Sequence, residues 1–438
     1  MQVAGKTVAV GAALKGKAAR WSYIAPTLFL LVVINQLDKT NIAVVMADPR
    51  FLSDMALTGK PTRIGFLSTI FFFGYGGGLL LWGFVVDRLG PRRSAMMGVS
   101  GWAAATLWCA MAHGINELFL ARFVLGIAEG CIWPVCNTYS SRWFPVSEQG
   151  RIQSLWVNGN QVGIAVGLPL VAVLISSGGW RTVFWVLGAG SLVLLEPMLL
   201  FLAPDQPDTS SCLEETERRP IAGSLGHEPA QLARDSSVKL GPLLSTAGFW
   251  LVTLCHAGTV ATLFGLTIWV PTYLTQARGL PFDALKGWVA FSYLLPIALA
   301  MGMGYWADRS LRPAMVGIGT SAVVAVMVLA AVAVSSATAS VLLLVTILAA
   351  PMIYGAMNAS LMQRLAAPEH IGRATGIFVG AGNLLGGLAP TIIGYLIGVF
   401  GGRYLAAFGF LSVTNFALVG LYYWLDRLTR IPDTALAA

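Results

Sequence analysis

Long apolar stretches alternate with short polar connections along almost the whole chain. About twelve of them are long enough, at about 20 residues each, to cross the hydrocarbon core of a bilayer as helices. We expect these spans at residues 22–45, 64–86, 94–113, 117–140, 152–175, 180–203, 248–275, 286–308, 314–335, 338–363, 371–399 and 403–425. The pattern therefore predicts an all-α integral membrane protein with twelve transmembrane helices.

The composition is also typical of an integral membrane protein. Of its 438 residues, 56% are hydrophobic and only 11% are charged, whereas a soluble domain carries about a quarter charged residues. The five cysteines show neither a pairing pattern nor the spacing of metal ligands. We therefore expect no disulfide, no metal and no cofactor.

The net charge of +8 could indicate nucleic-acid binding, but its distribution along the chain argues otherwise. If both termini are cytoplasmic, 19 of the 28 Lys and Arg residues fall on the cytoplasmic side. That bias is typical of membrane topology, because positive charges stay on the cytoplasmic side of inserted helices. We expect a multi-pass protein of a bacterial inner membrane, with both termini in the cytoplasm and no nucleic-acid partner.

The chain repeats itself at a nearly constant offset. The repeated pairs are Gly83/Gly304, Asp87/Asp308, Arg88/Arg309, Glu148/Glu369, Gly159/Gly380 and Pro169/Pro390 at 221 residues, and Arg151/Arg373, Gly179/Gly401 and Arg181/Arg403 at 222. This repeat predicts two pseudo-symmetric six-helix bundles, at residues 21–203 and 247–425. A polar cytoplasmic linker, 204–246, joins them, and tails at 1–20 and 426–438 flank them.

Four ionisable residues lie inside predicted spans: Asp38 and Lys39 in the first, and Arg122 and Glu129 in the fourth. A charge at the bilayer centre costs roughly 2.5–3.5 kcal/mol on insertion scales, so it seldom persists without a partner or a function. Arg122 and Glu129 are seven residues apart and share one helix face. Such a set is expected of a proton-coupled site for a small anion.

Two polar loops carry the first family resemblance. Residues 83–93 read GFVVDRLGPRR, and a degenerate copy, GYWADR, follows at residues 304–309. They resemble the loop signature of the major facilitator superfamily. We expect Gly83, Asp87, Arg88 and Arg92, with Asp308 and Arg309 in the copy, to latch the cytoplasmic side shut by helix capping and ion pairing. The alternative is an anchor that acts through positive charge alone.

Further motifs resemble one branch of that superfamily, the anion:cation symporter family. They are DKTNI at 38–42, RFVLGIAEG at 122–130, WVPTYL at 269–274 and GNLLGGLAP at 382–390. The family includes bacterial galactonate, glucarate, tartrate and phthalate permeases, and animal sialin and vesicular glutamate transporters. Most members move organic anions, usually with protons.

The resemblance implies roles for the four charged residues. Asp38 and Glu129 would carry protons, and Arg122 can pair with either an acid or a substrate carboxylate. Lys39 stands where the family usually has arginine. A lysine keeps the charge but lacks the planar fork of donors, so it grips an anion differently.

Other polar residues at membrane depth extend the candidate site. Tyr75, Gln161 and Asn383 match positions that line the site in galactonate-type relatives, and Asn358 is a further candidate. The alternative for each is a hydrogen bond that holds two helices together.

We therefore expect a transporter, not an enzyme, without catalytic residues. The predicted function is import of a small organic anion (a sugar acid, aromatic acid or dicarboxylate) by proton symport, with a monomer as the working unit. The sequence has no Walker motif that would bind ATP, which favours the proton gradient as the driving force. The alternatives are a proton-coupled exporter on the same fold and, from another class, a transporter-like receptor that senses a ligand without moving it.

Overall fold

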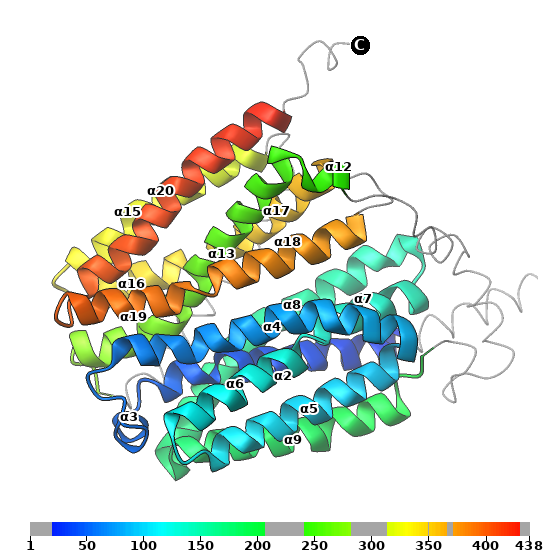
Figure 1. Cartoon of the computed structure of the whole chain (residues 1–438), viewed down its shortest axis with the longest axis horizontal. Coiled ribbons are helices and arrows are strands. Elements are labelled where there is room, and N and C mark those ends of the chain that lie inside the picture. Colours follow the sequence, from blue (N-terminus) through cyan, green and yellow to red (C-terminus); the bar gives the residue numbers. More distant parts are fainter. Residues whose placement is uncertain (1–19, 206–240, 282–312, 349, 366–370, 430–438) are drawn as a thin grey trace, which may run out of the picture. The chain divides into compact units, whose positions relative to one another are not determined.

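The computed structural model describes residues 20–205, 241–281, 313–348, 350–365 and 371–429, and these residues form helices and connections without a strand (Figure 1). The helices before the linker are η1 (Arg20–Ile24), α2 (Ala25–Val45), α3 (Pro49–Asp54), α4 (Pro61–Leu89), α5 (Pro91–Met111), α6 (Ile115–Glu129), α7 (Ile132–Trp143), α8 (Val146–Gly178) and α9 (Trp180–Phe201). Those after it are α12 (Gly241–Leu244), α13 (Ala247–Thr272), η3 (Tyr273–Ala277), α15 (Pro313–Ala333), α16 (Ala337–Ile347), α17 (Ala350–Leu365), α18 (Ile371–Gly386), α19 (Ala389–Val399) and α20 (Tyr404–Thr429).

These helices bear out the predicted membrane-spanning pattern. Nine helical stretches in the described part of the chain are long and apolar enough to cross a bilayer. Every predicted span has a helix at its position except 286–308, which lies outside the described residues. The prediction of an all-α membrane protein is thus confirmed.

Three predicted spans are divided into two helices each, at α6/α7, α16/α17 and α18/α19. Each first helix ends four or five residues before a proline, at Pro134, Pro351 and Pro390. A proline removes the hydrogen bond to the carbonyl four residues earlier, and its ring clashes with that carbonyl. Each break thus coincides with the hydrogen bond that a proline removes.

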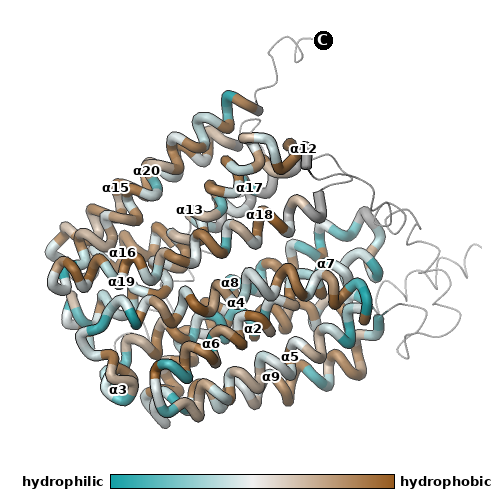
Figure 2. Tube along the Cα trace, in the orientation of Figure 1, coloured by the Kyte–Doolittle hydropathy of each residue, from teal (hydrophilic) through white to brown (hydrophobic). Residues whose placement is uncertain are grey.

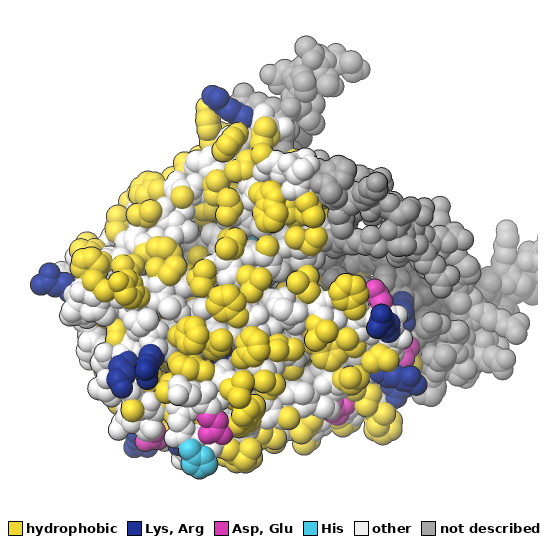
Figure 3. All heavy atoms as spheres, in the orientation of Figure 1, with side chains coloured by type: hydrophobic (Ala, Val, Ile, Leu, Met, Phe, Trp, Pro, Cys, Tyr) yellow, Lys and Arg dark blue, Asp and Glu magenta, His cyan; other side chains and the backbone are white. Residues whose placement is uncertain are grey.

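The outward faces of the helices are themselves apolar. On α9, Phe184, Leu187 and Leu195 are buried, while Val193 on the other side is 71% exposed. Figure 2 shows hydrophobic positions running along the helices, and Figure 3 shows hydrophobic side chains over their middle parts with charged side chains near their ends. Exposed apolar surface of this extent is what a lipid-facing helix requires.

By their contacts the residues group into two compact units. Unit 1 comprises 1–41, 74–167 and 178–236, and unit 2 comprises 42–73, 168–177 and 237–438. The helices α2, α4 and α8 therefore each contribute residues to both units. Within unit 2, the first part of α4 packs on the segment around α19: Thr69 Oγ1 donates to the Gly387 carbonyl at 2.7 Å, and Thr391 Oγ1 donates to Thr69 Oγ1 at 2.8 Å.

Each unit contains one pair of long helices in extensive contact. In unit 1, α5 lies along α9, and in unit 2, α15 lies along α20 (Figure 1). The repeated glycines Gly179 and Gly401 precede α9 and α20, with φ of +82° and +62°. Both have a positive φ, which glycine adopts without strain.

Candidate functional site

The four charged membrane residues come together inside unit 1. Asp38 and Lys39 lie on α2, and Arg122 and Glu129 lie on α6. Asp38, Arg122 and Glu129 are fully buried, and Lys39 is nearly so. The structure thus places the four residues on two helices of the same unit.

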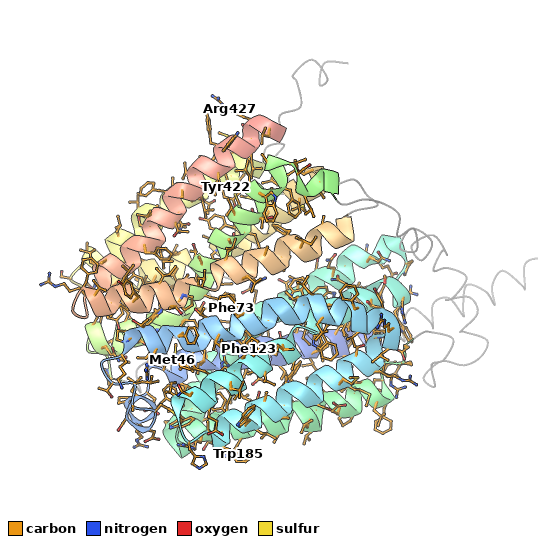
Figure 4. All side chains as sticks on the ribbon, viewed as in Figure 1. Met46, Phe73, Phe123, Trp185, Tyr422 and Arg427 are labelled. Atoms are coloured by element: carbon orange, nitrogen blue, oxygen red, sulfur yellow. The ribbon has the colours of Figure 1, made fainter. Side chains whose placement is uncertain are left out.

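Glycines allow α6 to lie directly against α4. A side-chain carbon at Gly130, just after α6, would lie 2.6 Å from the backbone carbonyl carbon of Gly78 on α4. A carbon at Gly74 would collide with the Phe123 carbonyl, and Figure 4 labels Phe123 on α6. Because these contacts involve backbone atoms, neither helix can yield locally. The close packing fixes the position of Glu129 beside α4.

A second glycine series holds α2. Gly159, Gly163 and Gly167 recur every four residues along α8 and face α2. A carbon at Gly163 would lie 2.6 Å from the Val33 carbonyl oxygen, and one at Gly167 would lie 2.8 Å from Leu37. Small residues at this spacing let two membrane helices approach closely. They set the position of the α2 segment that carries Asp38 and Lys39.

A hydrogen-bonded chain joins the two helices at the charged residues. Asn35 Nδ2 donates to Glu129 Oε2 at 2.9 Å, and Lys39 Nζ donates to Asn35 Oδ1 at 3.2 Å. The Lys39 ammonium also lies 4.1 Å from the centre of the Tyr75 ring, in the geometry of a cation–π contact. Lys39 is thus linked to Glu129 through an intervening amide.

Asp38 lies in a different setting from Glu129. Its Oδ2 is 3.5 Å from the Ser191 hydroxyl of α9. Arg122 interacts electrostatically with both Asp38 and Glu129. Asp38 Oδ1 and Glu129 Oε1 have no hydrogen-bond partner among the described residues. Both acids are therefore buried near cations while each keeps one oxygen available.

Among the neutral candidates, Tyr75 contacts Lys39 in the cluster, whereas Asn358 and Asn383 lie in unit 2. Asn358 on α17 is fully buried in unit 2, where it donates to Thr259 on α13 at 3.0 Å and accepts from Tyr422 on α20 at 2.9 Å. Tyr354 donates to Asn415 at 3.0 Å beside it. Figure 4 labels Tyr422. These bonds tie three helices together, which is the alternative role considered for Asn358.

Two more predicted residues have less definite surroundings. Asn383 on α18 donates to the Val379 carbonyl of its own helix at 2.8 Å, which leaves its amide oxygen for another group. Gln161 on α8 is half-buried. Their proposed contacts with substrate stay predictions.

Two membrane residues outside the predicted site also find partners. Glu196 on α9 accepts from the Ser100 hydroxyl at 2.6 Å. His256 on α13 packs on the Phe378 ring, with centroids 4.7 Å apart. Neither contact involves the charged cluster.

The segment 83–93, predicted as a loop, forms the end of α4, Gly90 and the first turn of α5. It is contacted by an acid that the motif does not contain. Asp205 accepts from the Arg92 backbone N–H at 2.9 Å, in the first turn of α5, and the Arg92 side chain donates to the Leu200 carbonyl. Asp87 and Arg88 are exposed, and a carbon at Gly83 would meet no described atom. Asp308 and Arg309 lie outside the described residues, so the latch stays a prediction.

Sequence reasoning missed Asn35 and Ser191. Asn35 is polar, lies at membrane depth and precedes Lys39 by four residues, which places the two on one helix face. That spacing could have identified it. Ser191 has no comparable signal, because only the packing of α9 brings it to Asp38.

A scan against protein-family models matches residues 28–390 to the family described as Major Facilitator Superfamily. The chain belongs to the major facilitator superfamily. This confirms the resemblance read from the two polar loops.

Among curated proteins, the chain is 29% identical over 288 residues to the "Probable sulfoacetate transporter SauU" of Cupriavidus necator, covering 65% of this chain and 64% of that protein. It is 26% identical over 395 residues to the "D-galactonate transporter" of Escherichia coli O6:H1, covering 85% of this chain and 88% of that one. The first of these matches thus spans less than two thirds of the relative's length. The names fit the anion:cation branch of the superfamily, and none of these relatives is an enzyme by name.

The same fold occurs in a solved structure, a bacterial homologue of the human lysosomal transporter Spinster in an inward-facing, unoccupied conformation. The TM-score is 0.73 over 93% of this chain and 97% of the other, at 17% identity. At that identity the likeness shows the fold alone. It confirms the predicted fold class of this superfamily.

Within the described residues, no group of three or more His, Cys, Asp or Glu side chains could hold a metal ion. The four free cysteines found there are buried singly.

Proposed function

We propose that this protein is a secondary active transporter that carries a small organic anion into the cell together with protons. The observation that carries the proposal is the buried cluster of Asp38, Lys39, Arg122 and Glu129 in unit 1. Relatives named as sulfoacetate and galactonate transporters support an organic anion as the cargo.

The charge balance of the cluster explains how protons and anion could be coupled. With both acids ionised, the two negative and two positive charges compensate one another, and an added anion has no uncompensated cation to bind. Protonation of Asp38 and Glu129 leaves Lys39 and Arg122 without their counter-charges. Because an uncompensated charge at membrane depth costs roughly 2.5–3.5 kcal/mol, the loaded cluster favours an anion.

Each cation has its own part in holding the anion. The Arg122 guanidinium can bind a carboxylate or sulfonate through two parallel hydrogen bonds, which fixes its orientation. The Lys39 ammonium provides a point charge on a flexible stem. The anion is released inside when Asp38 and Glu129 lose their protons, because the ionised acids again compensate the charges of Lys39 and Arg122. Alternating access would then carry both cargoes across.

We propose the inner membrane of a bacterium, both termini in the cytoplasm and a monomeric working unit, driven by the proton gradient without a cofactor. The excess of Lys and Arg on the expected cytoplasmic side supports this orientation. Reporter fusions at each terminus would test it.

The first experiment identifies the anion. Purified protein is heated with sulfoacetate, D-galactonate, tartrate and aromatic acids in turn. A ligand that binds the folded state raises the unfolding temperature. Ligands that do so are then tested for uptake into proteoliposomes, where accumulation should require an inward proton gradient.

The second experiment tests the coupling. Glu129→Gln should abolish gradient-driven accumulation but keep exchange of labelled for unlabelled anion. Glu196→Gln is the matched control, because that carboxylate lies on α9 and is bonded to Ser100, away from the cluster. If Glu129→Gln still concentrates the anion normally, Glu129 is not the coupling acid. Accumulation of the anion inside inverted vesicles, whose outer surface is the cytoplasmic face, would instead favour an exporter.

A further inference from the structure

Asn35 occupies a position between two opposite charges. It is 1% exposed and lies one helical turn before Lys39 on α2. Its Nδ2 donates to Glu129 Oε2 at 2.9 Å, while its Oδ1 accepts from Lys39 Nζ at 3.2 Å. One side-chain amide thus serves a predicted proton carrier and a predicted anion-binding cation at once.

We propose that Asn35 is a positioning residue that relays the protonation state of Glu129 to Lys39 and so decides when Lys39 is available to the anion. The proposal rests on the proposed function of the charged cluster and adds to it a residue that the family motifs do not assign.

The chemistry of the three groups defines two arrangements. An ionised carboxylate only accepts hydrogen bonds and an ammonium only donates them. With Glu129 ionised, the amide must therefore present its NH₂ to Glu129 and its oxygen to Lys39, as the structure shows. These bonds to charged groups are stronger than neutral ones, so they hold Lys39 in place.

Protonation of Glu129 changes what the amide can offer. A neutral carboxyl group carries an O–H donor, which the amide oxygen can accept after the amide turns by half a revolution. The amide NH₂ group then faces the Lys39 ammonium. Two donors cannot bond to each other, so Lys39 loses its acceptor and becomes available to an anion.

The residue at position 39 suits this release. A lysine holds Asn35 through a single point contact, whereas an arginine could keep a second hydrogen bond when the first is lost. The Tyr75 ring lies 4.1 Å from the Lys39 ammonium and would retain it in the cluster after release. The departure from the family's usual arginine is thereby accounted for.

Other groups also act on Glu129 and must be separated from the relay. The charged and titratable groups that interact with it are Asp38 and Lys39 from α2, Arg122 from its own helix, Tyr75 from α4, Cys109 from α5, and Cys131 next to the end of α6. Among the described residues, Asn35 alone is hydrogen-bonded to both Glu129 and Lys39. A test must therefore isolate the effect of Lys39 that passes through Asn35.

A double-mutant cycle isolates the effect of Lys39 on Glu129 that passes through Asn35, and it needs no substrate. The titration of Glu129 is followed by infrared difference spectroscopy of full-length protein, with its carboxyl band assigned by its loss in Glu129→Gln. We expect Lys39→Met to shift the titration midpoint by about one pH unit, a tenfold change in proton affinity. In the Asn35→Leu background, the same substitution should shift it by less than half as much.

The controls separate the relay from a merely structural role. Thr40→Val removes a hydroxyl that bonds only to the Gln36 carbonyl of its own helix, at 2.8 Å, and should leave the full shift. Asn35→Ser keeps a polar group too short to span both partners and replaces the leucine variant if that one does not fold. An equal shift in the presence and absence of Asn35 would show that Lys39 acts directly through space and would overturn the proposal.

The result is independent of the transport assays. Because the titration uses no anion, the cycle can succeed even if the protein carries no organic acid. Conversely, coupled uptake with an unchanged Lys39 effect in Asn35→Leu would support the proposed function and refute the relay.

Discussion

Substitution of Gly163 by alanine tests whether the close approach of α8 to α2 positions the charged cluster. The added methyl carbon would lie 2.6 Å from the Val33 carbonyl oxygen and 2.8 Å from Gln36 Cβ. Neither atom is the free end of a flexible side chain. The helices must separate by about 0.8 Å to bring the methyl group to ordinary contact with the carbonyl.

The expected cost follows from this displacement. Overpacking of this kind destabilises a folded protein by typically about 1–3 kcal/mol. Each kcal/mol lowers the unfolding midpoint by roughly 2–4 °C in a domain of about 150–250 residues and by less in a longer chain, so the variant should lose a few degrees. A shift of α2 of this size can also lengthen the 2.9 Å bond from Asn35 to Glu129 beyond hydrogen-bonding distance. Anion uptake should therefore fall along with stability.

The assay compares two glycines of the same helix. Gly150 also lies on α8, but a carbon there would meet no described atom. Thermal unfolding of detergent-purified protein should show Gly150→Ala at or above the wild-type midpoint, because alanine favours helix by about 1 kcal/mol. If Gly163→Ala is as stable as Gly150→Ala and transports normally, contact at Gly163 does not position α2.

Three further substitutions test other contacts, with the unfolding midpoint as the measurement. Tyr422→Phe removes the donor to Asn358 and should cost about 1–2 kcal/mol, the upper part of the range for bonds between membrane helices; an unchanged midpoint would contradict that role. Glu148→Ala leaves the Arg20 charge buried without its 3.2 Å partner and should cost up to about 3 kcal/mol, and Arg20→Met in the same chain should recover part of this. Asp205→Ala removes the acceptor at the start of α5 and should cost about 1 kcal/mol, whereas Asp205→Asn should cost less.

Much of the fold could be predicted because transmembrane helices are recognisable in a sequence by their length and hydropathy. What the sequence left open is where a span breaks. Pro134 and Pro351 follow helix breaks, while Pro169 and Pro197 lie inside continuous helices. A proline always removes one hydrogen bond, but only the surrounding packing decides whether the helix bends or ends.

The candidate site was predictable at the residues whose burial in a membrane is energetically costly. Buried charges such as Arg122 and Glu129 are costly enough to stand out in any membrane span. Asn35 does not, because a neutral amide at membrane depth serves equally well as a contact between helices. Asn358 is ambiguous in sequence for the same reason, since it could line the site or hold helices together. Its hydrogen bonds to Thr259 and Tyr422 are seen only in the structure.

The contribution of α4 to both units has a consequence for biogenesis. The chain is made from its N-terminus, so residues 61–73 enter the membrane before any residue of α13 or α19 exists. Until those helices arrive, Thr69 lacks its hydrogen bonds to Gly387 and Thr391, and Phe72 lacks the Phe264 ring that lies 4.4 Å away in the finished unit. The first six spans are therefore an incomplete product at that stage. A chain truncated at the linker should be recognised as unfinished by the membrane's quality-control proteases.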